Sequence, residues 1–366
     1  MIISLLLLQN FRNYPYLQLE LKPGVSLFLG KNAQGKTNLL EACYYMSTLT
    51  SPRAEKESDL AFWGASGFSL QGRLEDGPST TTIRIDVSMT PSLRRRILLN
   101  DRPAKRQDLS LSFPCVYFCP DDLYMVKGSS ALRRRFMDSL LSREDPVYAK
   151  DLSWYHDTVT RRNMALKKAP GDSSWEKTLE TLEDLLVDTG SRVLSKRLRL
   201  LRSFTEYVKE AYEFISGGEC HVSYNSSIGP IDEDLAGIRE TFKKTLEKYK
   251  TEERLRGMTL VGPHRDDLAI VFRDKTFRYF GSQGQQRSVV LALKMAEARS
   301  FEEVFHTKPV LLLDDVLSEL DDEKRSRVLS LCSFGYQILL TATDFPQDRG
   351  PGFHTFIVKD NNVTPL

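Results

Sequence analysis

The chain has 366 residues, with 41% apolar and 27% charged residues and a formal net charge of +2. This is an ordinary soluble globular composition with room for two domains and a sizeable core. The five cysteines form no CxxC pair, so we expect buried thiols in a reducing cytoplasm rather than a zinc site or disulfide bonds.

The N-terminal segment predicts strands. The apolar run Ile2–Leu8 is too short to span a bilayer and lacks a basic flank or a cleavage site, so we expect a first strand, a cytoplasmic protein and no membrane association. Leu17–Leu21 alternates apolar with polar residues, and Val25–Leu29 is a short apolar run. Both patterns are typical of strands.

A glycine loop follows the third strand and precedes a helical stretch, Asn38–Leu49. The loop matches GxxxxGK[ST] through Gly30, Lys31, Asn32, Ala33, Gln34, Gly35, Lys36 and Thr37. In this pattern backbone N–H groups surround nucleotide phosphates, the lysine reaches the β and γ oxygens, and the threonine ligates Mg²⁺. A plain glycine turn is the alternative, but average residue usage gives this pattern by chance on the order of one time in a hundred. We therefore predict a nucleotide site.

The middle of the chain first shows strand patterns and then helical periodicity. Phe68–Leu74, Thr82–Val87 and Arg96–Leu99 predict an antiparallel meander. From about Ala131 to about Arg256 the period becomes helical, with breaks at KKAPGDSS, ISGGE and IGPIDED. We expect an inserted helical arm, 131–256, between two halves of one α/β domain, 1–130 and 257–366.

Strand-like runs return after the arm, at Leu268–Phe272, Thr276–Phe280, Pro309–Asp315, Tyr336–Thr341 and Phe353–Lys359. The run Val310–Asp314 is an apolar strand that ends in a carboxylate, as a P-loop site requires. Asp314 is expected to hold Mg²⁺, and Asp315 to orient or deprotonate the attacking water. Many buried strands end in Asp because a turn follows, but the glycine loop and the following Ser318-Glu319-Leu320-Asp321 favour the catalytic interpretation.

The stretch Ser282-Gln283-Gly284-Gln285-Gln286, called the knuckle below, begins a helix upstream of the Asp314 strand. It resembles the LSGGQ signature of ABC-type ATPases. In that superfamily the serine, the glycine and the helix N-terminus close over the γ-phosphate bound to a second subunit. An N-cap is the alternative. A cap explains Ser282 but leaves Gly284, Gln285 and Gln286 unexplained.

Four further sequence motifs make the resemblance to one family of ABC-type ATPases more specific. They are QNFRNY at Gln9–Tyr14, FCPDDL at Phe118–Leu123, RRRF at Arg133–Phe136 and GPHRDD at Gly262–Asp267. In this order around the glycine loop and the knuckle, they resemble the bacterial RecF family. The resemblance implies an α/β, ABC-type (SMC-like) P-loop ATPase head with an antiparallel β lobe and an inserted helical arm. His264 with Asp266 and Asp267 suggests a metal cluster, but we expect a structural or coupling role.

The resemblance also implies function. It predicts a DNA-binding ATPase that binds ATP and Mg²⁺, forms a homodimer with ATP, and works with RecR and RecO to direct RecA onto gapped, SSB-coated DNA. By match of motif, Lys36 and Thr37 bind phosphate and magnesium, Ser282, Gly284 and Gln285 act across the dimer, and Arg12 lies near the nucleotide. Asp315 stands where most ABC ATPases have Glu, and Leu340–Asp344 offers no switch histidine. Both departures suggest slow hydrolysis.

Basic residues bunch in two places despite the small net charge. The first run is Arg94, Arg95, Arg96, Arg102, Lys105 and Arg106, and the second is Arg192, Lys196, Arg197, Arg199 and Arg202. Both are candidates for contact with duplex or gapped DNA, because sequence-independent binding to phosphates needs such clusters. A solvated helix face is the alternative for the second run.

Two other functions are alternatives to that of a RecF-type DNA protein. An energy-transducing ABC subunit of a transporter is disfavoured by the long gap between Lys36 and Ser282, by the arm and by the basic clusters. A GTPase-like switch is disfavoured because the chain lacks an obvious NKxD word and has the knuckle.

Overall fold

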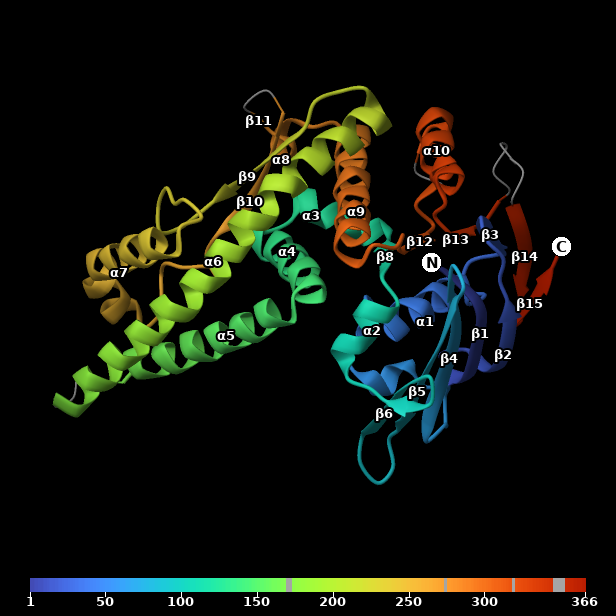
Figure 1. Cartoon of the computed structure of the whole chain (residues 1–366), viewed down its shortest axis with the longest axis horizontal. Coiled ribbons are helices and arrows are strands. Elements are labelled where there is room, and N and C mark those ends of the chain that lie inside the picture. The colour runs from blue at the N-terminus through green and yellow to red at the C-terminus, as the bar shows by residue number, and fades with distance from the viewer. Residues whose placement is uncertain (169–172, 273–274, 318–319, 345–352) are drawn as a thin grey trace. The chain divides into compact units, whose positions relative to one another are not determined.

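The computed structural model describes residues 1–168, 173–272, 275–317, 320–344 and 353–366 (Figure 1). The chain forms two compact units. Unit 1 contains Met1–Asp122, Phe214–Ser216 and Leu291–Leu366, and unit 2 contains Leu123–Glu213 and Gly217–Val290. The division of the sequence at 130/131 and 256/257 stays a prediction.

The first sheet of unit 1 is the antiparallel β lobe. Its strands run in the order β2-β1-β4-β5-β6-β7. They are β1 (Ile2–Phe11), β2 (Tyr14–Glu20), β4 (Gly67–Asp76), β5 (Ser79–Ser88), β6 (Arg94–Leu99) and β7 (Arg102–Pro103). The expected first strand and meander are confirmed, and the meander pairs directly with β1.

The second sheet of unit 1 has the order β15-β14-β3-β13-β12-β8. Its strands are β3 (Val25–Leu29), β8 (Cys115–Phe118), β12 (Val310–Asp314), β13 (Ile338–Ala342), β14 (Phe353–Lys359) and β15 (Asn362–Pro365). All pairings are parallel except that of β14 with β15. Every residue of β3, β8 and β12 is buried, as expected for parallel strands covered on both faces.

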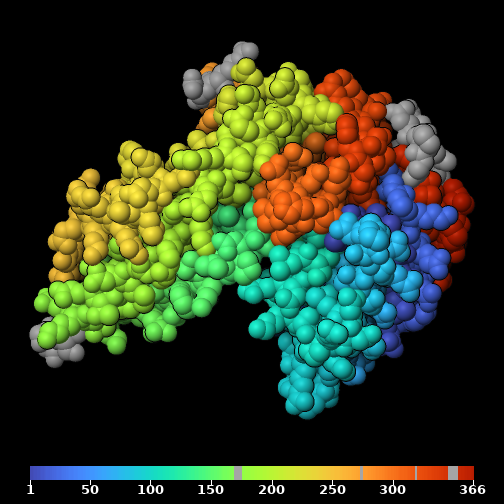
Figure 2. Space-filling model, viewed as in Figure 1, coloured from blue at the N-terminus to red at the C-terminus, as the bar shows by residue number. Residues whose placement is uncertain are grey.

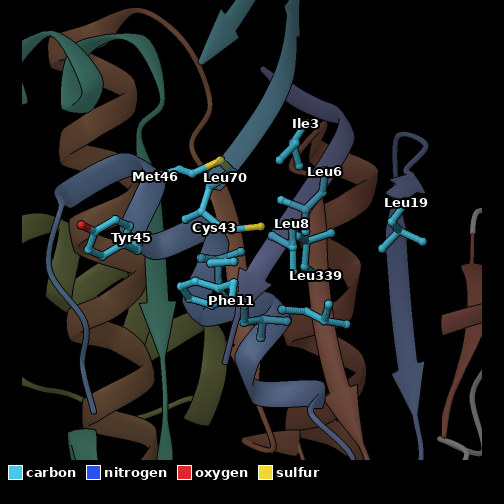
Figure 3. Packing of buried hydrophobic residues seen from close by; sticks show 14 of the residues in the cluster. Ile3, Leu6, Leu8, Phe11, Leu19, Cys43, Tyr45, Met46, Leu70 and Leu339 are labelled. Carbon is cyan, nitrogen blue, oxygen red and sulfur yellow. The ribbon is translucent and has the colours of Figure 1, made fainter. Parts of the chain in front are cut away.

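Helix α1 (Lys36–Thr48) contacts strands of both sheets and fills the space between them. Figure 3 shows the resulting core, in which Cys43 and Met46 of α1 meet Leu8 of β1 and Leu70 of β4. The shorter helices of this unit are η1 (Glu57–Leu60), α2 (Arg106–Ser112), α10 (Asp322–Leu329) and η4 (Ser330–Phe334). The 3-10 turn η2 (Pro120–Leu123) leads out of it.

The cysteines occur as thiols, as the sequence predicts. All five cysteines lie in the described ranges and are free thiols; Cys43, Cys115 and Cys220 are buried, whereas Cys119 and Cys332 are half-buried. No helix within the described ranges is long and apolar enough to cross a bilayer.

Unit 2 is the helical arm with a small sheet. Its helices are α3 (Tyr124–Lys127), α4 (Ser130–Glu144), α5 (Pro146–Leu166), α6 (Ser173–Ser216), α7 (Leu235–Arg256) and α8 (Phe277–Phe280), and α9 (Gln283–Phe305) begins there. The expected break ISGGE falls at the end of α6 and IGPIDED lies between α6 and α7, whereas most of the expected break KKAPGDSS lies outside the described residues. The strands are β9 (His221–Asn225), β10 (Asp267–Phe272) and β11 (Lys275–Thr276), in the order β11-β10-β9.

Two local expectations for this unit were wrong. Thr276–Phe280 is not a strand, because β11 ends at Thr276 and Phe277–Phe280 form the helical turn α8. The arm also contains β9, which sequence reasoning missed because its pairing partner β10 lies more than forty residues later. Alternating patterns over about five residues do not distinguish a short strand from a helical turn, so tertiary pairing decided both cases.

The GPHRDD word forms a buried hydrogen-bond network in unit 2. Tyr155 Oη lies 2.6 Å from His264 Nδ1, and His264 Nε2 lies 3.2 Å from the Thr259 carbonyl oxygen. Asp266 accepts a hydrogen bond from Tyr224 Oη at 2.6 Å. The described residues contain no group of three or more His, Cys, Asp or Glu that could hold a metal. The structural or coupling role expected for this motif stays a prediction.

We predict that His264 makes the stability of the arm sensitive to mild acid. Burial lowers the pKa of this imidazole from 6.5 to about 4, so the folded protein keeps it neutral while the unfolded chain takes up a proton. The free energy of unfolding is therefore unaffected by His264 above pH 6.5, and it decreases as the pH falls from 6.5 toward 4. Relative to His264→Gln, the wild type should lose about 2 kcal/mol between pH 7 and pH 5 in urea unfolding experiments. A difference that stays constant with pH would contradict the prediction.

Candidate nucleotide-binding site

The glycine loop lies in unit 1 between β3 and α1, as its pattern predicts. Gly35 has φ +100° and precedes the first residue of α1. A Cβ on Gly35 would lie 2.3 Å from Asn13 Nδ2, and a Cβ on Gly30 would lie 2.3 Å from the Val358 carbonyl oxygen. Both positions therefore require glycine. Gly35 needs it for its positive φ, and both Gly30 and Gly35 need it because a neighbouring segment of the chain comes close.

Lys36 holds its side chain against the loop. Its Nζ donates to the carbonyl oxygens of Gly30 at 2.6 Å and Lys31 at 2.9 Å. Burial lowers the pKa of this amine, while the nearby carboxylates of Asp315 and Asp314 act in the opposite direction. The ammonium group is thus placed inside the loop, where a phosphate would lie.

Asp314 is the centre of the site. Its Oδ1 accepts hydrogen bonds from Thr37 Oγ1 and Thr341 Oγ1, both at 2.8 Å, and its Oδ2 accepts one from Tyr117 Oη at 2.8 Å. The three donors come from α1, β13 and β8. Parallel pairing of β12 with β13 and β8 places these strand ends side by side. Burial, followed by the Asp314 charge, raises the pKa of the Tyr117 phenol, so it remains a donor.

Tyr117 and Thr341 were missed by sequence reasoning. Both occupy the C-terminal ends of strands that flank β12 in the sheet. Their position could have been found only from the strand order, because neither belongs to a recognisable word.

Asp315 follows directly after β12. Its φ is +54°, and its backbone N–H donates to Thr341 Oγ1 at 2.9 Å. The left-handed backbone turns the chain sharply at the strand end, which fixes where this second carboxylate begins. Ser318 and Glu319 of the expected follow-on word lie outside the described residues, while Asp321 caps α10 by accepting from the Lys324 N–H at 2.9 Å.

These residues fit a magnesium nucleotide. The Thr37 hydroxyl and the Asp314 carboxylate offer hard oxygen atoms 2.8 Å apart, beside the lysine of the loop. Mg²⁺ prefers such oxygens and is commonly bound through one or two protein groups together with substrate phosphates. This donor set suits a cation shared with a phosphate better than a cation bound by protein alone.

Arg12 lies in the turn between β1 and β2, and its side chain reaches Glu41 of α1. Its expected position near the nucleotide stays a prediction. Its guanidinium makes two hydrogen bonds to the buried carboxylate of Glu41, at 2.8 and 2.6 Å, and a third to the Asp59 carbonyl oxygen at 2.7 Å. The adjacent Asn13 was missed by sequence reasoning, although it belongs to the QNFRNY word. Its Nδ2 donates to the Gln34 carbonyl oxygen at 3.3 Å, and its Oδ1 accepts from Asn38 at 2.7 Å.

The knuckle lies in unit 2 at the start of α9, and Ser282 to Gln285 are exposed. Ser282 and Gln285 cap each other: the Ser282 N–H donates to Gln285 Oε1 at 2.9 Å, and the Gln285 N–H donates to Ser282 Oγ at 3.3 Å. Gln286 is buried and donates to the Phe277 carbonyl oxygen at 3.0 Å. Local structure therefore explains three of these residues, contrary to the expectation that capping explains only Ser282.

Gly284 has no such local explanation. A Cβ at this position would meet no atom within 4 Å. Gly284 is exposed at the N-terminus of α9 with open space around it, so a group from another molecule could approach the backbone there closely.

Comparisons with known proteins agree with this geometry. The family model described as RecF/RecN/SMC N terminal domain matches residues 2–344. The DNA replication and repair protein RecF of Bacillus mycoides (strain KBAB4) is 37% identical over 350 residues, covering 94% of this chain and 92% of that protein. The RecF of Bacillus thuringiensis (strain Al Hakam) is 36% identical over 348 residues with the same coverage.

The chain belongs to the RecF family.

Solved structures place this RecF-family chain in the expected fold class. The recombination mediator protein RecF-ATPrS in the RecFOR pathway matches with a TM-score of 0.90 and 32% identity, covering 100% of this chain and 98% of that one. RecF-ATP matches with a TM-score of 0.89, 32% identity and 97% coverage of that chain. An Smc head from Pyrococcus yayanosii, at 14% identity, matches with a TM-score of 0.57. The α/β, SMC-like ATPase head with a helical arm is confirmed.

The first basic run of this RecF-family chain is exposed on the β lobe and at the start of α2. Arg94, Arg95, Arg96, Arg102, Lys105 and Arg106 are all exposed in unit 1. Arg95 pairs with Glu57 at 2.8 Å. The loop that joins β5 to β6 projects from the sheet in Figure 1, and Figure 2 shows this region, in cyan, at the surface. The run remains a candidate for DNA contact.

In the second basic run, the expected DNA contact was wrong for Arg197, which is buried. For Arg192, Lys196, Arg199 and Arg202 it stays a prediction. Arg197 is buried and donates to Asp138 at 2.7 Å, to Tyr224 Oη at 2.9 Å and to the Pro263 carbonyl oxygen at 2.8 Å. The other three charges are paired: Arg192 with Asp151 and Asp188, Lys196 with Asp145, and Arg202 with Glu233. Arg199 is exposed. Helical spacing shows which residues share a face but not whether that face packs against acidic neighbours.

We predict opposite outcomes for two arginines of this run. Arg197→Gln should destabilise the protein by about 3–5 kcal/mol, because it leaves the Asp138 carboxylate without its buried partner. Arg199→Gln, two residues away and exposed, should change the free energy of unfolding by less than about 0.5 kcal/mol. Guanidinium unfolding monitored by circular dichroism measures both. Equal, small effects would show that Arg197 is solvated.

Proposed function

We propose that this chain is an ATP-switched, DNA-binding ATPase that acts in recombinational repair and replication restart. It binds ATP with Mg²⁺ and forms a homodimer in the ATP state. With RecR and RecO it helps direct RecA onto gapped, SSB-coated DNA in the cytoplasm. The observation that carries the proposal is the 2.8 Å hydrogen bond from Thr37 to Asp314, which joins the glycine loop to the carboxylate at the end of β12.

The roles of the loop residues follow from their positions. Backbone N–H groups of residues 30–37 and the α1 N-terminus bind the phosphates, because both present partial positive charge. Lys36 exchanges its contacts with the Gly30 and Lys31 carbonyl oxygens for the β and γ oxygens. Thr37 and Asp314 would hold Mg²⁺, which would supply positive charge to the phosphates.

Asp315 is the proposed hydrolytic residue. It follows Asp314 at the sheet edge, where it orients or deprotonates the attacking water. Its side chain is one methylene shorter than the Glu usual in ABC ATPases, and its strained backbone leaves little freedom to compensate. Hydrolysis is therefore slow, and ATP binding rather than turnover drives the change of state.

Ser282, Gly284 and Gln285 act across the dimer, on the γ-phosphate bound by a second copy. Support comes from the exposure of the knuckle and from the open space at Gly284. Further support comes from the names of similar proteins: a DNA replication and repair protein RecF, and RecF-ATP in the RecFOR pathway.

The first prediction from this proposal separates binding from turnover. Lys36→Ala should abolish ATP binding and ATP-dependent DNA binding, since it removes the phosphate contact. Asp315→Asn should bind ATP normally and keep or prolong the dimer, because it removes only the carboxylate charge. Equilibrium binding of a fluorescent ATP analogue and analytical ultracentrifugation measure the two properties. An Asp315→Asn protein that binds ATP but stays monomeric would refute the switch.

The second prediction concerns the knuckle. Ser282→Arg should leave ATP binding by the monomer intact and abolish ATP-dependent dimerisation, because a bulky cation obstructs the partner's site. Ser282→Ala is the matched control, since it loses the same cap without adding bulk; capping loss alone costs about 1 kcal/mol. Sedimentation with ATP should show dimer for the alanine variant and monomer for the arginine variant. Equal loss of ATP binding and of dimerisation in the arginine variant would mean that the knuckle is only a helix cap.

The third prediction concerns the β lobe. Arg94→Gln with Arg96→Gln should weaken duplex binding alike for all sequences and lower the slope of log Kd against log salt by about 2, because each lost phosphate contact removes roughly one released counterion. Arg299→Gln is the control, since this exposed arginine pairs with Glu303 at 3.1 Å. Fluorescence anisotropy at several salt concentrations gives the slopes. An unchanged slope in the double variant would place the DNA elsewhere.

A further inference from the structure

Trp63 is an exposed aromatic side chain that the nucleotide site does not use. The side chain is 96% exposed, more than any other large apolar residue of the described ranges. The other two tryptophans have partners: Trp154 lies under Lys150 Nζ at 4.6 Å, and Trp175 donates to the Ala165 carbonyl oxygen at 3.0 Å. An indole presented to water without support is costly, which points to a ligand for its faces.

The backbone around Trp63 is held firmly. Phe62 N–H donates to the Asn10 carbonyl oxygen at 2.7 Å, and Ala61 bridges to Phe11 of β1. The Ala65 N–H then donates to the Phe62 carbonyl oxygen at 2.9 Å, which closes a β-turn with Trp63 and Gly64 in its centre. Gly64 has φ +83°, as the third position of a type II turn requires. The indole therefore projects from a fixed turn.

The same end of the β lobe carries the unpaired arginines. Gly67 of β4 pairs with Ser88 of β5, which pairs with Arg94 of β6. The Met89 N–H donates to the Ser66 carbonyl oxygen at 2.8 Å, so the Trp63 loop adjoins the start of the β5–β6 loop. Two strand spacings and the four residues of chain from Gly67 to Trp63 put the backbones of Trp63 and Arg94 at most about 25 Å apart.

The charges at this end favour a polyanion. Arg94 and Arg96 are exposed, and within the described ranges neither has a carboxylate within ion-pair distance. Burying them in a protein interface would leave them uncompensated, which is costly. Contact with phosphates compensates them and leaves them partly solvated.

We propose that Trp63 stacks on an unpaired base of single-stranded DNA whose phosphates lie along Arg94 and Arg96. Stacking on an aromatic ring is available to every base, but only when the base is free of the duplex. The two features together recognise the single-stranded side of a gap. The inference rests on the proposed function, because it assumes that the β lobe binds DNA.

The test compares single-stranded and duplex binding in the full-length protein with ATP, using a fluorescein-labelled oligo-dT and a duplex of equal length. Trp63→Ala should bind oligo-dT about tenfold more weakly, with duplex affinity changed less than twofold. Trp63→Phe should recover most of the loss, since it keeps an aromatic face. Trp154→Ala, on α5, is the matched control and should behave as the wild type. Circular dichroism establishes that each variant is folded.

A direct readout uses tryptophan fluorescence. In a Trp154→Phe, Trp175→Phe protein, emission comes from Trp63 alone and should be quenched by oligo-dT. If this protein does not fold, the wild type minus Trp63→Phe difference spectrum gives the same signal.

The outcomes separate the two proposals. If the wild type binds duplex DNA and Trp63→Ala binds oligo-dT as tightly as the wild type does, the stacking proposal alone is overturned. Failure of the wild type to bind either DNA overturns the proposed function. Loss of ATP-dependent dimerisation in Trp63→Ala, with normal oligo-dT binding, would make the indole a protein contact and also overturn stacking.

Discussion

The hydrogen bonding of the Asp314 carboxylate is the constraint on which the nucleotide unit depends. A buried carboxylate is stable only when its oxygens are satisfied, and Asp314 obtains donors from Thr37, Thr341 and Tyr117. These donors belong to three segments far apart in the sequence. Their convergence requires β12 to lie between β13 and β8, in parallel, with matching strand ends. The strand order of the parallel sheet is therefore what brings the three donors to Asp314.

The packing of α1 extends the same constraint to the β lobe. One face of this helix covers the parallel sheet and another meets β1 and β4, so the helix that begins with the phosphate loop also anchors the antiparallel sheet. Arg12 strengthens this connection, because it leaves the β1–β2 turn and closes on the buried Glu41 of α1. Any displacement of the loop would disturb a core shared by two sheets, which explains how a glycine-bearing segment is held rigid enough to present its N–H groups.

The two basic runs differ in how far their arginine side chains are exposed to solvent. At the edge of the β lobe, Arg94 and Arg96 have solvent beside them and remain exposed. In the arm, α6 is enclosed by neighbouring helices and by the GPHRDD loop, so Arg197 points into the interior and meets Asp138 and Tyr224. Arg162 of α5 does the same with Glu253 at 2.7 Å. The arm thus contains buried ion pairs as well as apolar contacts, and removal of one partner would leave an uncompensated buried charge.

The sequence by itself determined the local elements and the parts of the site that act through the backbone. The glycine loop, its strand and helix, Asp314 and the knuckle could be placed because their chemistry needs specific residues at fixed spacing. Tertiary structure decided what depends on partners distant in the chain. It alone supplied Tyr117 and Thr341 to Asp314, paired β9 with β10, and buried Arg197 while leaving Trp63 exposed. Burial and pairing are properties of the packed whole, so periodicity in one segment cannot fix them.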